Sequence, residues 1–121
     1  MELVAARDKE GWIALYSEDA LIEDPVGPSP FDPQGAGHRG REHMAVFWDG
    51  TIATTERLDF EIVSSYAAGD EVANVGNITA HLPGGVQLET NGVYVYRVNT
   101  DGLITSLRAF WEFERAMGTV R

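Results

Sequence analysis

The segment Leu21–Gly27, LIEDPVG, ends an apolar run with two adjacent acids and a proline. In an extended strand alternate side chains point to opposite faces, so Asp24 shares a face with Ile22 while Glu23 points the other way. If Ile22 faces an interior, Asp24 faces it as well. A carboxylate in an apolar pocket can serve as a general base, because burial raises its pKa. The competing interpretation is a strand end in a solvated turn, where Asp24 caps the turn backbone and Glu23 is solvated or pairs with an arginine.

The composition narrows the class of protein. A chain of 121 residues fits one domain, residues 1–121, with 44% hydrophobic residues as in globular proteins. The absence of cysteine excludes disulfides and cysteine nucleophiles. A net charge of −10 argues against nucleic acid and anionic membranes as partners, and leaves neutral or hydrophobic ligands. No apolar run reaches the length of a membrane span and residues 1–10 lack a signal sequence, so we expect a cytoplasmic protein.

The first half of the chain has a helical pattern around one short strand. Apolar residues at helical spacing predict a helix over residues 2–16, in one piece or two, and another over residues 41–53. Residues 20–24 form the strand that leads to Asp24. Residues 25–40 are rich in proline and glycine and predict a long loop, which is either a lid over a binding site or a surface excursion.

From residue 57 onward apolar residues recur at every second position instead of at helical spacing. This alternation predicts strands over residues 57–62, 72–82, 86–98 and 103–113, with a hairpin turn at residues 99–102. Helices followed by antiparallel strands indicate an α+β fold. Long strands curl, and helices across the concave side would close a cavity. We therefore predict a curved antiparallel β-sheet wrapped by the N-terminal helices.

Three stretches resemble the ketosteroid isomerase branch of the nuclear transport factor 2-like (SnoaL-like) proteins. They are YSEDALIEDPVG at residues 16–27, GREHMAVFW at residues 40–48 and VYRVNTDGLITSLRAFWE at residues 95–112. The resemblance covers nearly the whole chain in order. It implies a sheet wrapped by helices into a cone-shaped barrel, a deep apolar cavity and a homodimer formed through the sheet.

The resemblance also implies a chemistry, the shift of a carbon–carbon double bond in a 3-oxosteroid. In that family, a known case of carboxylic acids tuned by their surroundings, an aspartate moves the proton while two donors hold the dienolate oxygen. The base is the aspartate before the proline, Asp24 here. One donor position falls at Tyr94, and an aromatic that supports the other donor falls at Trp48. That other donor, a tyrosine, belongs upstream of the matched residues, so we expect either a short gene product or a lost N-terminal segment.

The remaining candidate residues are expected to line the cavity. Gly92, on the strand face of Tyr94, would leave room for a ligand or mark a bend of the sheet. We expect a small hydrophobic molecule, such as a steroid, to contact a set of mostly apolar side chains: Ile22, Phe47, Trp48, Tyr96, Ala109 and Trp111.

No metal or other cofactor is expected. His38, His43 and His81 match no common metal-ligand spacing, and no glycine-rich phosphate loop is present. Several functions remain open on these residues. They are a steroid Δ-isomerase, a hydrophobic-ligand binding protein that has lost the reaction, another enzyme of the same fold, and an assembly module with a filled cavity.

Overall fold

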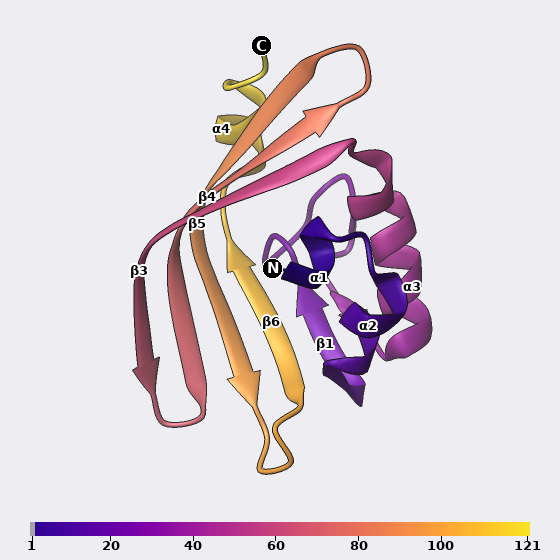
Figure 1. Cartoon of the computed structure of the whole chain (residues 1–121), viewed down its shortest axis with the longest axis vertical. Coiled ribbons are helices and arrows are strands. Elements are labelled where there is room, and N and C mark those ends of the chain that lie inside the picture. The colour runs from indigo at the N-terminus through magenta and orange to yellow at the C-terminus, as the bar shows by residue number, and fades with distance from the viewer. Residues whose placement is uncertain (1) are drawn as a thin grey trace.

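A computed structural model describes residues 2–121 as a curved sheet with the N-terminal helices on its concave side (Figure 1). The helices are α1 (Glu2–Ala5), α2 (Lys9–Ala14), α3 (Arg41–Gly50), the short 3-10 helix η1 (Ile52–Thr54) and α4 (Phe113–Met117). The strands are β1 (Tyr16–Glu23), β2 (His38–Arg39), β3 (Arg57–Ala68), β4 (Glu71–Leu82), β5 (Val86–Val98) and β6 (Ile104–Phe110). The predicted α+β class and the curved sheet wrapped by N-terminal helices are confirmed.

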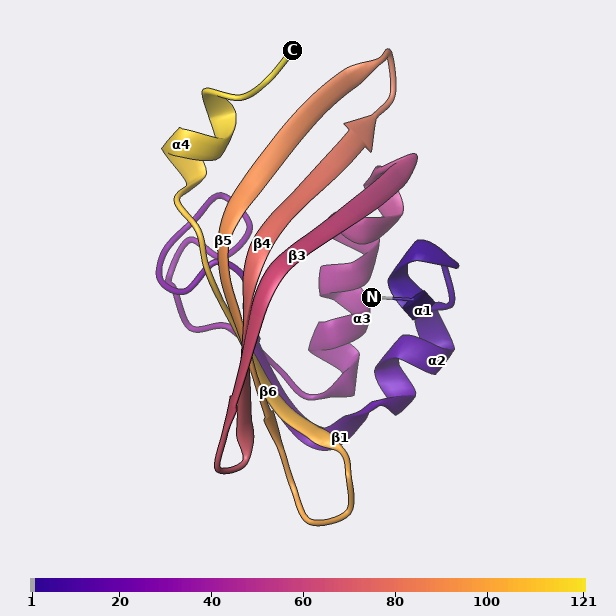
Figure 2. The same cartoon turned by 60° about the vertical axis from the view of Figure 1, so that its left-hand side comes forward.

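The sheet has six strands in the order β2-β1-β6-β5-β4-β3. Neighbouring strands run antiparallel, except that β1 and β6 are parallel. The expectation of an antiparallel sheet is therefore wrong at this pair. The expected barrel is also wrong, because β2 and β3 are opposite edges and the sheet stays open. Helices α2 and α3 lie against the side toward which the sheet curves (Figures 1 and 2).

Two paired glycines lie where the long strands bend. Gly76 of β4 faces Gly92 of β5, next to a register shift in β3 between Ile62 and Ser64. A Cβ atom at Gly76 would collide with the carbonyl oxygen of Glu61, and one at Gly92 would collide with a β6 carbonyl oxygen. The backbones therefore approach too closely for any side chain. The alternative that Gly92 marks a bend fits this geometry, and Gly92 is not among the residues that line the pocket described below.

The core joins the helices to the first strand through aromatic rings. Trp12 of α2 packs against Tyr16 of β1 at 5.1 Å and against Trp48 of α3 at 5.2 Å between ring centroids. Ile22 and Met44 are fully buried beside them. This packing anchors β1, and with it the segment that carries Asp24, to the helical layer.

The N-terminal helix is divided, and its last predicted residue lies in a strand. Arg7 has a φ of 62°, which interrupts the helix, and Asp8 restarts it by accepting a hydrogen bond from the Gly11 amide at 3.0 Å. Tyr16 begins β1, so the strand is longer at its start than the predicted residues 20–24, and it ends at Glu23. Long-range packing of Tyr16 overrides its local helical pattern.

Two elements were absent from the prediction. Strand β2 is only two residues long and is defined by its pairing with β1, which local periodicity cannot reveal. Helix α4 begins at Phe113, so the strand predicted over residues 103–113 ends at Phe110. Alternating apolar residues continue past that point, but their side chains belong to a turn and a helix.

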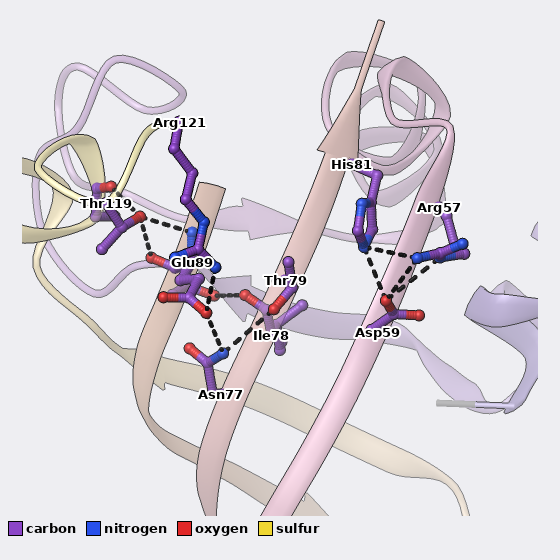
Figure 3. A network of polar contacts seen from close by, with 11 residues as sticks. Arg57, Asp59, Asn77, Ile78, Thr79, His81, Glu89, Thr119 and Arg121 are labelled. Carbon is purple, nitrogen blue, oxygen red and sulfur yellow. Dashed lines mark hydrogen bonds and ion pairs between the residues drawn. The ribbon is translucent and has the colours of Figure 1, made fainter. Parts of the chain in front are cut away.

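The outer face of the sheet carries polar side chains near α4 (Figure 3). Asp59 accepts hydrogen bonds from His81 at 2.8 Å and from Arg57 at 3.2 Å, and these partners lower the pKa of its carboxyl group. The C-terminal segment joins β5 through Thr119, whose hydroxyl accepts from the Glu89 amide at 2.8 Å, and through Arg121, which lies 3.6 Å from the Glu89 carboxylate. His81 is therefore tied to the outer face. No helix within residues 2–121 is long and apolar enough to cross a bilayer.

Candidate active site

A pocket of about 460 Å³ opens between the concave face of the sheet and the helices. This volume lies within the range of pockets that hold drug-sized ligands. Its wall is mostly apolar and comes from every layer of the fold. The lining residues used below are Asp24, Phe31, Phe47, Thr51, Thr54, Thr55, Thr90, Tyr94, Tyr96, Leu107, Trp111 and Phe113.

Asp24 lines this pocket and is held from one side. Its carboxylate accepts a hydrogen bond from the indole nitrogen of Trp111 at 2.6 Å. The next residue but one, Val26, donates its amide to the Ala109 carbonyl at 2.9 Å, which fixes the segment against β6. Burial raises the pKa of Asp24, and the Trp111 hydrogen bond partly opposes that rise by favouring the carboxylate.

Glu23 occupies the opposite side of the sheet. Its carboxylate lies 3.1 Å from the guanidinium of Arg108, which also stacks over the Phe110 ring. Adjacent acids thus have different environments, an ion pair for Glu23 and a largely apolar pocket for Asp24. The alternation of side chains along β1 produces this separation.

Tyr94 lines the pocket, but its hydroxyl proton is already used. The phenol donates to the Thr90 carbonyl at 2.8 Å and lies 3.0 Å from the Thr90 hydroxyl. Burial raises the pKa of Tyr94 to about 12. The group is therefore neutral at physiological pH and directed along its own strand.

Tyr96 lies two residues further along β5 on the same face. It lines the pocket, and its hydroxyl has no hydrogen-bond partner within residues 2–121. Burial, followed by the nearby carboxylate of Asp24, raises the pKa of Tyr96 to about 12. Tyr16, which the sequence did not single out, has its pKa raised well above 10.0 by burial, Tyr96 and Asp24. Three neutral phenols, those of Tyr16, Tyr94 and Tyr96, thus lie near the carboxylate.

The other residues expected to contact a ligand divide into two groups. Phe47 and Trp111 line the pocket. Ile22, Trp48 and Ala109 are buried in the core behind it, with at most 4% of each side chain exposed, and do not belong to the pocket wall. All three belong to the same hydrophobic core cluster as the lining residues Phe47 and Leu107.

Sequence reasoning did not place two aromatic residues, Phe31 and Phe113, on the pocket wall. Phe31, from the long loop, meets Phe113 of α4 edge to face with 6.0 Å between ring centroids. Both rings line the pocket, and Phe31 is 42% exposed. The aromatic ring of Phe31 favours a lid for the long loop on the sequence alone, whereas Phe113 was assigned to a strand. Within residues 2–121 no three histidine, aspartate or glutamate side chains come together as metal ligands.

An open curved sheet with helices across its concave face defines the nuclear transport factor 2-like class of proteins. The family model of the SnoaL-like domain matches residues 1–107, and the chain belongs to this family. The resemblance to the ketosteroid isomerase branch is confirmed by named relatives.

Three of these relatives are informative. The steroid Delta-isomerase of Nocardioides simplex is 31% identical over 111 residues, which make up 92% of this chain and 82% of that protein. The Delta 5-3-ketosteroid isomerase of Mycobacterium sp. has a TM-score of 0.87 at 33% identity, covering 99% of this chain and 89% of that one. The RV0760c protein of Mycobacterium tuberculosis, solved in complex with estradiol-17beta-hemisuccinate, has a TM-score of 0.87 at 38% identity, covering 93% and 88% of the two chains.

Proposed function

We propose that this protein is a steroid Δ-isomerase that moves a double bond in a 3-oxosteroid or a similar hydrophobic ketone. The observation that carries the proposal is the Asp24 carboxylate, which lines an apolar pocket and is oriented by Trp111. A raised pKa brings a carboxylate closer to the basicity that proton abstraction requires. The relatives named as steroid isomerases support the choice of substrate class.

The proposed reaction begins with Asp24 as general base. Its carboxylate removes a proton from the carbon between the carbonyl group and the double bond, and the C–H electrons form the dienolate as negative charge moves to the carbonyl oxygen. Asp24 then returns the same proton two carbons further along, and the conjugated ketone forms. The developing charge on oxygen needs a hydrogen-bond donor, since an unassisted carboxylate abstracts such a proton slowly.

A hydrophobic-ligand binding protein is the second candidate. The commitment of the Tyr94 hydroxyl to Thr90 favours it, because the donor expected from the sequence is not free to hold an oxyanion. The two functions separate when the protein is mixed with a Δ5-3-oxosteroid and the ultraviolet absorbance of the conjugated product is followed. Turnover supports the isomerase, and tight binding without turnover supports the binding protein.

The pH dependence of turnover tests the role assigned to Trp111. The reaction needs ionised Asp24, so kcat/KM falls as pH drops through the raised pKa of that residue. Tyr16, Tyr94 and Tyr96, the titratable groups near Asp24, have raised pKa values and stay neutral there. The Trp111→Phe variant loses a donor to the carboxylate, so we expect the acid limb to move to higher pH.

The matched control for this experiment is Trp48→Phe, which removes an indole from the core outside the pocket wall. Its acid limb should stay where it is in the unsubstituted protein. An acid limb that fails to move in Trp111→Phe, or moves to lower pH, would contradict the proposed support of Asp24 by Trp111.

We further propose a homodimer that forms through the outer face of the sheet. Cross-strand partners place Val75, Val93 and Phe110 in one row on that face, and Phe110 is 43% exposed. An apolar row at the surface is typical of an interface. Light scattering should give the mass of a dimer, and the Phe110→Lys variant should give the mass of a monomer. A monomer before substitution would contradict the proposed dimer.

The cytoplasmic location stays a prediction from the sequence.

A further inference from the structure

The pocket offers few side-chain donors, and nearly all of them are occupied. The hydroxyls of Thr51, Thr54 and Thr55 donate to backbone carbonyls of their own segment at 2.6–2.7 Å. The Trp111 indole donates to Asp24. These groups cannot serve a ligand without giving up a bond, since each has a single proton to donate.

The Thr90–Tyr94 pair is occupied in the same way. Tyr94 donates to the Thr90 carbonyl, and the Thr90 hydroxyl contacts both the Tyr94 oxygen and the Ile78 carbonyl. Tyr96 is different, because it lines the pocket and its hydroxyl makes no hydrogen bond within residues 2–121. Of the hydroxyl groups that residues 2–121 place on the pocket wall, only that of Tyr96 has no protein hydrogen-bond partner.

Strand register puts Tyr96 within reach of the reacting centre. Tyr96 pairs with Leu107 of β6, and Leu107 pairs with Ile22 of β1, so the three form one row across the sheet. Asp24 follows Ile22 by two residues on the same face, which places it in the adjacent row, about 7 Å along the strands. The influence of the Asp24 charge on the Tyr96 phenol agrees with this proximity.

We infer that Tyr96 is the hydrogen-bond donor to the carbonyl oxygen of the bound ketone, the role that the sequence assigned to Tyr94. This inference rests on the proposed function. In the reaction the Tyr96 proton stays on the phenol and strengthens its bond to oxygen as the dienolate forms, while Asp24 alone carries the transferred proton. A donor with no protein acceptor binds the oxyanion without first breaking another hydrogen bond.

Two readouts test the inference with the variants Tyr96→Phe and Tyr94→Phe. For turnover of a Δ5-3-oxosteroid, we expect Tyr96→Phe to lower kcat by about 10²–10³-fold, the usual loss for one oxyanion donor, with a smaller change in KM. We expect Tyr94→Phe to lower kcat by a smaller factor. Tyr66→Phe, on an exposed ring outside the pocket, removes the same hydroxyl group and should leave turnover unchanged.

The second readout is the absorbance of a bound conjugated 4-ene-3-oxosteroid, which moves to longer wavelength when its carbonyl accepts a hydrogen bond. The shift should be present with the unsubstituted protein and with Tyr94→Phe, and lost with Tyr96→Phe. Thermal unfolding of each variant checks that the fold is intact. A merely structural role for Tyr96 would change stability without removing the shift.

The two proposals fail in distinguishable ways. If the shift depends on Tyr96 but no Δ5-3-oxosteroid is turned over, the donor assignment stands and the isomerase is overturned. If turnover occurs and the shift depends on Tyr94, the isomerase stands and the donor assignment is overturned. Absence of any shift with the unsubstituted protein also overturns the donor assignment.

Discussion

The Asp24→Asn variant is expected to lower kcat for a Δ5-3-oxosteroid by about 10²–10⁴-fold, the range typical of a lost general base. An amide has the shape of the carboxylate but cannot accept the proton from carbon. The pocket keeps its volume, so steroid binding should persist or become tighter. Product absorbance measures turnover, and calorimetric titration with the product measures binding.

Glu23→Gln is the matched control, because it makes the same chemical change one residue earlier. Glu23 pairs with Arg108 on the outer side of the sheet and has no contact with the pocket. We expect its kcat to stay within about twofold of the unsubstituted protein, because the ion pair lies outside the pocket and a partly exposed pair contributes little. Equal losses in the two variants would overturn the assignment of Asp24 as the base.

Asp24→Asn should also raise the free energy of unfolding at neutral pH. The pKa of Asp24 is raised by burial, so the folded state binds a proton more tightly than the unfolded state does. The stability that this group contributes is complete below its unfolded pKa and is lost as pH rises through the folded pKa. Thermal unfolding should therefore show a larger gain from Asp24→Asn at neutral pH than in acid.

The second large effect is expected at the bend of the sheet. Gly92→Ala adds only a Cβ atom, but that atom would overlap the backbone oxygen of Phe110. Backbone must shift to relieve the overlap, so we expect the free energy of unfolding to fall by about 2–3 kcal/mol, as in overpacked cores. Denaturant titration measures this change.

Gly50→Ala provides the control with the opposite sign. Gly50 ends α3, and a Cβ atom there meets no heavy atom within 4 Å. Alanine is the better helix former by roughly 0.8–1 kcal/mol, so this variant should be as stable as the unsubstituted protein or more so. A stable Gly92→Ala variant would show that the strands do not need a glycine at the bend.

The sequence predicted the parts of the site that follow from local alternation. The face of Asp24 and the outward direction of Glu23 depend on a period of two along β1, and the neighbouring residues were enough to derive both. Phe47 lies on the apolar stripe of helix α3, and Trp111 follows β6 directly, and both line the pocket.

The remaining features depend on contacts between distant segments. The parallel pairing of β1 with β6 needs the whole topology, and the bond from Tyr94 to Thr90 needs side-chain geometry that no pattern encodes. Phe31 and Phe113 lie 6.0 Å apart between ring centroids although a large part of the chain separates them. The bond from Tyr94 to Thr90 leaves the Tyr96 hydroxyl, of those that residues 2–121 place on the pocket wall, as the one without a protein partner, and the choice of oxyanion donor follows from it.

The opposite orientations of the two neighbouring acids bear on how relatives of this protein should be compared. Arg108 and Trp111 hold Glu23 and Asp24 on the two sides of one strand. Gain or loss of a single residue inside that strand would exchange the acids while leaving the letters E-D-P intact. In an alignment, therefore, the tripeptide identifies a proton-transferring aspartate only when the spacing back to the start of the strand is also preserved.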